Sequence, residues 1–257
     1  MSVVTPKQSL TDEIDVPKNI NVGLICPNAA YLTALLGSPR DDYSDTCQNV
    51  SNKKLATLIK TESVGPFAVT GLSSAVESLK SIASEIKRSQ PDVYSKLGTA
   101  GMLCCRYQRG SRKISSHSWG TAIDLKLAGK LDVRGNMKVH YGLSLISPIF
   151  NSHGWYWGAA FRTEDAMHFE VSKGKLEEWK SSGLFGSEKD PTLKRGDAGE
   201  AVRQLQRKLN QYGAKLRDDG DFGGNTEKAL QKFQLQHNLR AEYGTVGEKT
   251  RKALKLS

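Results

Sequence analysis

The chain of 257 residues carries 37 lysines and arginines against 27 aspartates and glutamates, a formal net charge of +10. Hydrophobic residues make up 38% of it and charged residues 25%, which is typical of a folded globular protein and excludes a largely disordered one. No apolar run approaches the roughly 20 residues that span a bilayer, so we expect no stable insertion into a membrane. The polar, acid-bearing start of the chain lacks the apolar core of a secretion signal, which predicts that no standard signal peptide is present.

The basic excess is spread over the whole chain. The stretch from Asp190 onward has 14 basic and 9 acidic residues, and the part before it has 23 and 18. A diffuse excess suits any anionic partner, whether nucleic acid, an acidic membrane surface or a cell-wall polymer. Because no nucleic-acid-binding motif accompanies the charge, we predict that nucleic acid is not a partner.

In chain order, the first elements predicted are a loose arm, a mixed segment and a helix. Residues 1–19 show no hydrophobic periodicity and are expected to form a flexible arm. Residues 21–40 are mixed and end in a Gly-Ser-Pro-Arg turn. Residues 70–88 predict an amphipathic helix with a basic last turn, whose apolar stripe consists of Leu72, Val76, Leu79, Ile82 and Ile86.

Between Gly98 and Val171 glycines become frequent, and the pattern changes to short alternating strands. Residues 121–127 alternate so that a strand would bury its isoleucine face and turn Asp124 to the other side. Residues 165–171 alternate in the same way, with His168 and Glu170 opposite the apolar face. Two strands would therefore each offer a nitrogen or oxygen ligand away from the core.

A candidate metal site follows from these two strands. His117 comes just before the first strand, and with Asp124 and His168 it gives two imidazoles and one carboxylate. That composition is typical of a catalytic zinc site with an open position, where zinc polarises a carbonyl and makes water nucleophilic. Spacing alone leaves a metal site and three unrelated polar side chains equally open. The other three histidines are not accompanied by further candidate ligands in the strand pattern and are interpreted as ordinary surface or core residues: His140, His153 and His237.

A hydrolytic zinc site also needs a proton acceptor and a group that stabilises negative charge. Asp165 and Glu164 are both candidates for the acceptor. Arg106 or Arg109 could hold an oxyanion or a substrate carboxylate.

The cysteines show no CxxC or histidine-rich spacing, so a cysteine zinc site is not expected. The four are Cys26, Cys47, Cys104 and Cys105. A Cys26–Cys47 disulfide and free core thiols both stay open as interpretations.

The last third of the chain divides into a linker and a repeated module. Residues 181–191 are small, polar and glycine-rich, which predicts a linker. In residues 192–257, Gly220 and Thr226 recur 24 positions later as Gly244 and Thr250, within a longer repeat. Each repeat places a threonine where it could cap a helix. With a third apolar stripe upstream, the tail predicts a small all-α module of three helices.

The motif Ser115-x-His117-x-x-Gly120-x-Ala122-x-Asp124 is the full SxHxxGxAxD signature of the VanY-like D-Ala-D-Ala carboxypeptidase and L-alanyl-D-glutamate endopeptidase family. The chain resembles that family over about residues 20–175. The stretch 153–158 resembles its aromatic-glycine turn, Asp165-x-x-His168 its acid-x-x-His pair, and the stretch 101–106 its arginine-bearing strand.

This resemblance implies a zinc peptidase with an α+β fold in residues 20–180, in which a small antiparallel sheet carries the ligands and helices lie on its other side. It implies that His117, Asp124 and His168 bind zinc. It further implies that Asp165 is the general base, that Arg106 stabilises the anionic transition state and that Ser115 assists near the substrate. Glu164 is at the wrong distance from His168 for the base in this pattern. The residues after Arg106 depart from the longer insertion common in relatives, which leaves Arg109 open.

The tail resembles the peptidoglycan-binding-1 domain, through Leu193-Lys-Arg-Gly196, Asp219-Gly-Asp-Phe-Gly223 and Phe233-Gln234. A generic helical dimerisation or spacer module is the alternative. Both resemblances name the same polymer, and together they imply a monomeric peptidase that cuts peptidoglycan stem peptides while its tail holds the wall. A non-catalytic wall-binding protein with a relic zinc site is the alternative from another class.

Two different peptide bonds of the stem peptide are candidates for the bond that is cut. An L-Ala–D-Glu endopeptidase breaks cross-linked wall, whereas a D-Ala-D-Ala carboxypeptidase trims stem peptides. A chain without a signal sequence and with a wall-binding tail resembles a phage endolysin. Such a lysin is expected to wait in the host cytoplasm and then to act on the wall from the periplasm, which favours the endopeptidase.

Overall fold

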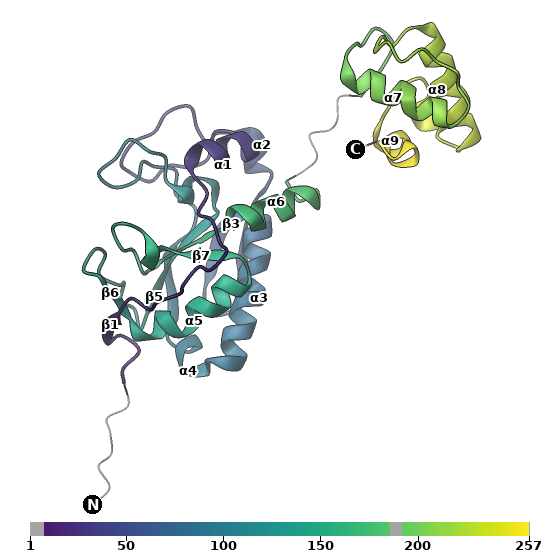
Figure 1. The fold of residues 1–257 in the computed structure, drawn as a ribbon. Helices are drawn as coiled ribbons and strands as arrows, with labels where there is room; N and C mark the ends of the chain where they lie inside the picture. Colours follow the sequence, from purple (N-terminus) through teal and green to yellow (C-terminus); the bar gives the residue numbers. More distant parts are fainter. Residues whose placement is uncertain (1–7, 186–191, 257) are drawn as a thin grey trace, which may run out of the picture. The chain divides into compact units, whose positions relative to one another are not determined.

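The computed structural model describes residues 8–185 and 192–256. They belong to two compact units, an N-terminal unit of residues 1–185 and a C-terminal unit of residues 186–257 (Figure 1). Of the linker expected at residues 181–191, residues 186–191 lie outside the described part. Phe185 belongs to the N-terminal unit, because its buried ring packs edge-on against Trp179.

The N-terminal unit is an α+β fold, as predicted. Its main sheet has four antiparallel strands in the order β4 (Leu97–Gly101), β5 (Ala122–Leu127), β8 (His168–Val171) and β7 (Trp155–Trp157). Two antiparallel pairs complete the strands: β2 (Ile59–Ser63) with β3 (Ala68–Leu72), and β1 (Glu13–Asp15) with β6 (Lys138–His140).

Two long helices cover the main sheet. They are α3 (Ser73–Ser89) and α5 (Tyr141–Ser152), and the shorter helices are α1 (Ala29–Leu36), α2 (Lys53–Ala56), α4 (Pro91–Tyr94) and α6 (Lys173–Ser181). Short 3-10 turns stand at η1 (Ser116–Trp119) and η2 (Gly158–Ala160). Within the described residues, no helix combines the length and apolar character that crossing a bilayer requires.

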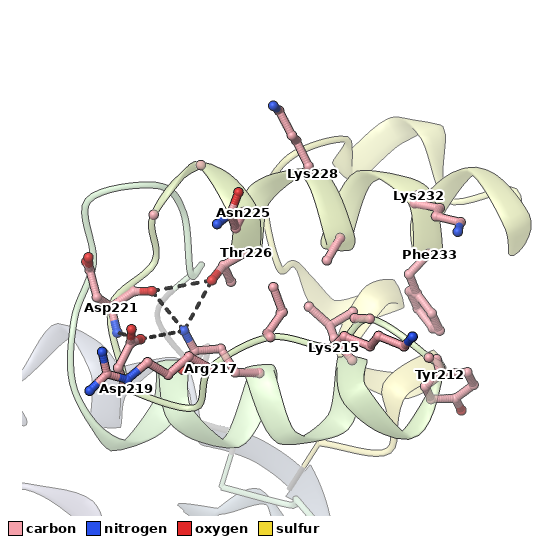
Figure 2. A pocket seen from close by; sticks show the side chains of 18 of the residues that line it. Tyr212, Lys215, Arg217, Asp219, Asp221, Asn225, Thr226, Lys228, Lys232 and Phe233 are labelled. Carbon is pink, nitrogen blue, oxygen red and sulfur yellow. Dashed lines mark hydrogen bonds between the residues drawn. The ribbon is translucent and has the colours of Figure 1, made fainter.

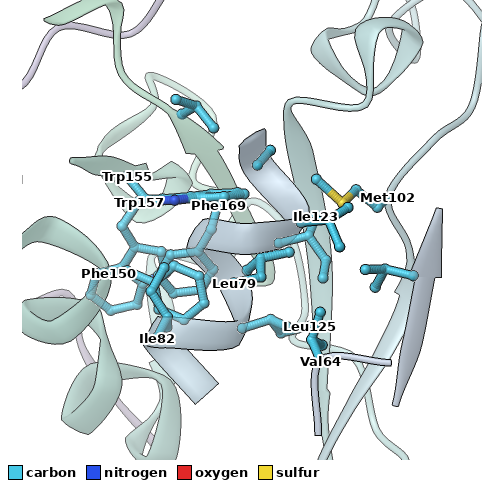
Figure 3. Close-up of a cluster of buried hydrophobic side chains, with 14 of the residues drawn as sticks. Val64, Leu79, Ile82, Met102, Ile123, Leu125, Phe150, Trp155, Trp157 and Phe169 are labelled. Atoms are coloured by element: carbon cyan, nitrogen blue, oxygen red, sulfur yellow. The ribbon is translucent and has the colours of Figure 1, made fainter. Parts of the chain in front are cut away.

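The core of this unit forms where α3 meets the sheet. Leu79 and Ile82 of α3 lie near aromatic rings from α5, β7 and β8 (Figure 3). Those rings are fully buried and belong to Phe150, Trp155, Trp157 and Phe169. The helix predicted over residues 70–88 is thus confirmed from Ser73 onward. Residues 70–72 instead extend β3, because Leu72 pairs with Ile59 across the β2–β3 hairpin.

The flexible arm expected at residues 1–19 is wrong for the residues closest to the fold, while residues 1–7 lie outside the described part. Residues 13–15 form β1, and Ile14 pairs with Val139 of β6 and packs against the core. A strand of three residues is too short to show periodicity, and its partner is far along the chain. The pairing is therefore invisible in the local sequence.

The suggested Cys26–Cys47 disulfide is also wrong. Cys47 is bonded to Cys104, and Cys26 and Cys105 are free thiols. The neighbouring backbone explains the pairing, since Gln48 forms an isolated antiparallel bridge with Cys105 and so brings the two segments together.

The C-terminal unit is the small all-α module that the sequence predicts. Its helices are α7 (Glu200–Gln211), α8 (Gly224–Gln236) and α9 (Glu248–Leu254), with a 3-10 turn at η3 (Arg240–Glu242). Their apolar sides enclose a core of its own, made of Leu193, Val202, Leu205, Leu209, Phe222, Leu230, Phe233, Val246 and Leu254.

A buried glutamine organises the first half of this unit. Gln206 donates from Nε2 to Asp219 Oδ1 and to Asp221 O, both at 2.9 Å, and its Oε1 accepts from the amide of Gly220 at 2.8 Å. Nε2 also lies 3.2 Å from Thr226 Oγ1. The side chain of Gln206 therefore ties α7, the following loop and α8 together.

Gln234 repeats this arrangement in the second half. Its Nε2 donates to Glu242 O and Thr245 O, its Oε1 accepts from Gly244 N at 2.8 Å, and Thr250 Oγ1 lies 3.0 Å away. The sequence repeat of Gly220 and Thr226 thus marks two equivalent glutamine networks. The expectation that the threonines cap helices is wrong, because α8 and α9 begin after glycines that make no side-chain cap.

Candidate metal centre and active site

The structure brings together the three residues predicted as metal ligands. His117 lies in η1, Asp124 in β5 and His168 in β8, and Asp124 stands directly opposite His168 in the strand pairing. Leu125 N donates to Met167 O at 2.8 Å, which makes the neighbouring 124–168 pair a non-hydrogen-bonded one. Side chains of such pairs approach most closely, so the strand register itself places these two ligands side by side.

The ligand atoms form a compact triangle. His117 Nε2 lies 3.2 Å from Asp124 Oδ1 and 3.2 Å from His168 Nδ1, and His168 Nδ1 lies 3.1 Å from Asp124 Oδ1. Ligands bonded to zinc at 2.0–2.1 Å in a tetrahedron are separated by roughly 3.3 Å. Among the described residues, this is the one cluster of histidine, cysteine or acidic side chains close enough to hold a metal ion. The donor set fits zinc with one position left for water or substrate.

A backbone carbonyl fixes the ring of His117. Its Nδ1 lies 2.8 Å from Met102 O, and because a carbonyl only accepts, Nδ1 carries the proton and Nε2 is free to bind a metal. The turn that carries this histidine ends at Gly120, which has φ +64°. A Cβ there would lie 2.7 Å from Leu72 N, so the close approach of η1 to β3 requires glycine.

A buried carboxylate fixes the ring of His168. His168 Nε2 lies 3.2 Å from Glu170 Oε2, and the other carboxylate oxygen accepts from the thiol of Cys26. Such carboxylate–histidine–metal arrangements orient the ring and raise its basicity. The strand pattern placed Glu170 on the face of His168 but gave it no role, and its contact with Cys26 is 144 residues away along the chain.

The electrostatics of the site favour a positive charge at its centre. Burial opposes ionisation of Asp124, but hydrogen bonds with His117 and His168 outweigh it and hold the pKa of this carboxyl well below its usual range. Burial likewise opposes protonation of His168, but Asp124 and Glu170 outweigh it and raise its pKa to about 10. Without a metal the two carboxylates hold a proton on the ring, and a divalent cation would take its place.

Asp165 lies beside this cluster. Its backbone O accepts from His168 N at 3.1 Å, its Oδ2 lies 3.2 Å from Arg134 Nε, and its Oδ1 is buried without a hydrogen-bond partner among the described residues. Burial raises the pKa of Asp165; the charge of Asp124 adds to this, and His168 and Arg134 oppose it. A carboxylate with one free oxygen and a raised pKa suits a proton acceptor.

Glu164, the other acceptor considered, is engaged elsewhere. Its side chain is fully buried, with Oε1 accepting from Ala166 N at 2.7 Å and Oε2 from Gly135 N at 3.0 Å. It therefore anchors the loop that carries Arg134.

The arginine that pairs with Asp165 is neither of the two considered from the sequence. The guanidinium of Arg106 donates to Tyr107 O at 3.2 Å, and no contact found in the described residues joins it to the three ligands. Arg109 is exposed, and Ser115 is buried with its amide donating to Arg106 O at 3.0 Å. The arginine that contacts Asp165 is Arg134, which lies in a loop without periodic pattern. The roles of Arg106 and Ser115 stay predictions.

Known proteins resemble the chain in two segments. Residues 109–171, which hold the triangle and Asp165, match the family described as D-alanyl-D-alanine carboxypeptidase. The site segment resembles a zinc peptidase. Residues 198–254 match the family described as peptidoglycan binding domain, so both predicted resemblances are confirmed, and the likeness to a phage endolysin stays a prediction.

A zinc D-Ala-D-Ala carboxypeptidase of Streptomyces albus G is 47% identical over 62 residues, which are 23% of this chain and 24% of that protein. The chain thus matches about a quarter of the length of this relative. No solved structure matches the chain.

Proposed function

We propose that the protein is a zinc-dependent peptidase that hydrolyses peptidoglycan stem peptides and is held to the wall by its C-terminal unit. The observation that carries the proposal is the triangle of His117, Asp124 and His168, with edges of 3.1–3.2 Å, inside the segment that matches a carboxypeptidase family. The match of residues 198–254 to a peptidoglycan binding domain supports the same polymer as substrate.

The chain's own residues divide the work of hydrolysis. Zinc in the triangle would supply Lewis-acid polarisation of the peptide carbonyl and make water nucleophilic near neutral pH. Asp165 Oδ1, which no described residue contacts by a hydrogen bond, accepts the proton of the attacking water and passes it to the leaving amine. Arg134 holds the other oxygen of Asp165 and so fixes the direction of Oδ1. Arg106 and Ser115 are assigned to the anionic transition state and the substrate.

The test is a pair of histidine variants assayed on purified sacculi. His168→Ala is expected to lose zinc binding and release of soluble peptides, while the protein still sediments with the sacculi. His153→Ala is the matched control. This half-buried histidine is not one of the three ligands, and its Nε2 lies 2.9 Å from Glu85 Oε2. Release of peptides by folded His168→Ala protein would refute the proposal. Sedimentation without products from the wild type would favour a non-catalytic wall-binding protein with a relic zinc site.

Within this function we infer that the bond cut is L-Ala–D-Glu, as in an endolysin. A wall-binding unit is of most use to an enzyme that breaks the insoluble wall, since tethering raises the local concentration of the catalytic unit there. D-Ala-D-Ala carboxypeptidase activity is the second candidate, favoured by the name of the relative from Streptomyces albus G.

Mass spectrometry of the soluble products separates these two activities. Sacculi are digested with zinc-loaded protein, with an EDTA-treated sample as control. New N-terminal D-Glu on released peptides is the expected result. Free D-Ala from a wall that stays cross-linked would mean a carboxypeptidase and would remove the argument for a lysin.

The lysin proposal also makes a statement about location. The protein is expected to accumulate in the host cytoplasm and to reach the wall from the periplasm only after the inner membrane is permeabilised. Expression in a bacterial cytoplasm should therefore leave the cells intact until a membrane-permeabilising agent is added. Lysis that begins without the agent would contradict this order of events.

A further inference from the structure

A pocket of about 520 Å³ opens on the C-terminal unit, between the end of α7, the following loop and α8 (Figure 2). We propose that this pocket binds a carboxylate of the peptidoglycan stem peptide and is where the unit grips the wall. The inference rests on the proposed wall-binding function and adds the place and the chemical group that is recognised. The volume lies within the range of sites that hold small ligands.

The charges that line the pocket favour an anion. The lining includes four cations, Lys215, Arg217, Lys228 and Lys232, and two carboxylates, Asp219 and Asp221. None of the ion pairs in the described residues involves Lys215, Lys228 or Lys232. An ammonium group that no carboxylate of the described residues pairs with is available for one on a ligand.

The acidic groups are set apart from the lysines. Asp219 Oδ1 accepts from Gln206 Nε2 at 2.9 Å and from Asp221 N at 3.0 Å, and these hydrogen bonds hold the pKa of its carboxyl below the usual value. Asp219 is therefore part of the glutamine network. Figure 2 shows Arg217, Asp219 and Asp221 at one end of the pocket and Lys215 and Lys232 at the other.

Aromatic rings stand at the lysine end. Tyr212 is 47% exposed, and its ring lies edge-on to Phe233 with centroids 4.8 Å apart. This end therefore offers ammonium groups beside an apolar surface. A stem peptide combines carboxylates with short alkyl side chains, whereas the glycan strand of the wall consists of sugars without free carboxylates. The combination at Lys215, Lys232 and Tyr212 matches the peptide better than the glycan.

The experiment uses the full chain carrying His168→Ala, so that the probe is not cut. Binding of N-acetylmuramyl tetrapeptide is compared by calorimetry with binding of the same compound after its carboxylates are amidated. Charge-assisted hydrogen bonds of this kind change affinity by about tenfold or more. We therefore expect amidation to weaken binding by at least that factor, and Lys215→Gln with Lys232→Gln to do the same.

A matched pair of substitutions controls for net charge. Lys252→Gln with Lys255→Gln removes the same two charges from exposed positions of the C-terminal unit that do not line the pocket. This control is expected to bind the tetrapeptide within about twofold of the parent, and circular dichroism checks that both double variants are folded. Equal loss of affinity in both double variants would overturn the proposal, since it would show a general charge effect.

Two further outcomes separate the pocket from the function on which it rests. Failure of the parent chain to sediment with sacculi would refute wall binding itself. Sedimentation of the parent, with equal affinity for the free and the amidated tetrapeptide, would overturn the carboxylate pocket and leave wall binding standing. Binding of carboxylate-free N-acetylglucosamine oligosaccharides as tight as that of the tetrapeptide would also overturn it, in favour of a sugar ligand.

Discussion

Glu170 lies buried between the metal ligand His168 and the free thiol of Cys26, and its negative charge is what holds the ring in place. Glu170→Gln keeps the size of the side chain and removes the charge. We expect zinc affinity to fall about 10–100-fold, the usual cost of losing a partner that orients a metal-binding histidine. Competition with a chromophoric chelator measures this. Glu178→Gln, on the exposed side of α6, is the control and should bind zinc like the wild type.

Asp132 is a buried carboxylate outside the metal site, where its Oδ2 accepts from His140 N at 2.6 Å. Burial raises the pKa of Asp132 above the ordinary 3.8, against the opposing effect of His140. A group with a raised pKa binds its proton more tightly in the folded state, so the fold loses stability as pH rises from 3.8 through the raised value.

Asp132→Asn removes this titration. The free energy of unfolding of the variant, measured in urea between pH 4 and pH 7, is therefore expected to increase relative to that of the wild type as pH rises. The comparison needs no absolute value, because only the difference between the two proteins at each pH is used. Parallel pH profiles would show that Asp132 has an ordinary pKa in the folded protein.

The residues that could be predicted from sequence are those within one local pattern. His117, Asp124 and His168 were recognisable because strand alternation puts two of them off the core face and the motif adds the third. The participation of Arg134 and Cys26 could not be predicted. Their contacts with Asp165 and Glu170 cross long stretches of chain and depend on how loops fold back.

At the level of elements, the turn from β7 into η2 has to pass very close to the metal site. A Cβ on Gly158 would lie 2.6 Å from Asp165 O and 3.1 Å from His168 Cβ. Gly158→Ala is therefore expected to displace both residues and to lower the melting temperature and zinc affinity together, as monitored by calorimetry. Gly174→Ala in α6 is the matched control.

For the control, Gly174→Ala, no loss of stability is expected. Nothing lies within 4 Å of a Cβ on Gly174, and alanine in a helix is more stable than glycine by about 0.5–1 kcal/mol. Gly174→Ala should leave zinc binding unchanged and the melting temperature unchanged or slightly raised. A Gly158→Ala protein that behaves the same way would mean that the turn can open without moving the site.

Elements with several turns or a full alternating pattern were predictable, and shorter ones were not. The helix around Leu79 and the strand around Asp124 each carry enough apolar positions to define a period. β1 has three residues and exists because β6 pairs with it. The two threonines that looked like caps are buried against Gln206 and Gln234, and only the three-dimensional arrangement shows that a glutamine, and not the helix end, is their partner.

At the scale of the whole molecule, the two units carry different spectroscopic signals. All four tryptophans lie in the N-terminal unit, whereas both units contain helices. Gln206→Leu leaves the buried amide of Gly220 without its acceptor and Thr226 without its neighbour, at a cost of about 3 kcal/mol. We expect this variant to shift a urea transition seen by circular dichroism and to leave the tryptophan fluorescence transition in place.

Gln204→Leu changes an exposed glutamine on the same helix and controls for the substitution type. Its circular dichroism transition should match that of the wild type. If Gln206→Leu moved the fluorescence transition by the same amount, the two units would unfold as one, and the division of the chain into separately stable parts would be wrong.

The pairing of Asp124 with His168 has a consequence for how this chain can change in evolution. Side chains alternate between the two faces of a strand, so inserting or deleting one residue within β5 or β8 would send a ligand to the core face. The segment between them, residues 128–167, contains β6, α5 and β7 and the loops that flank them. Length variation among descendants of this sequence should therefore gather in those loops, and the two ligand strands should keep their register without gaps.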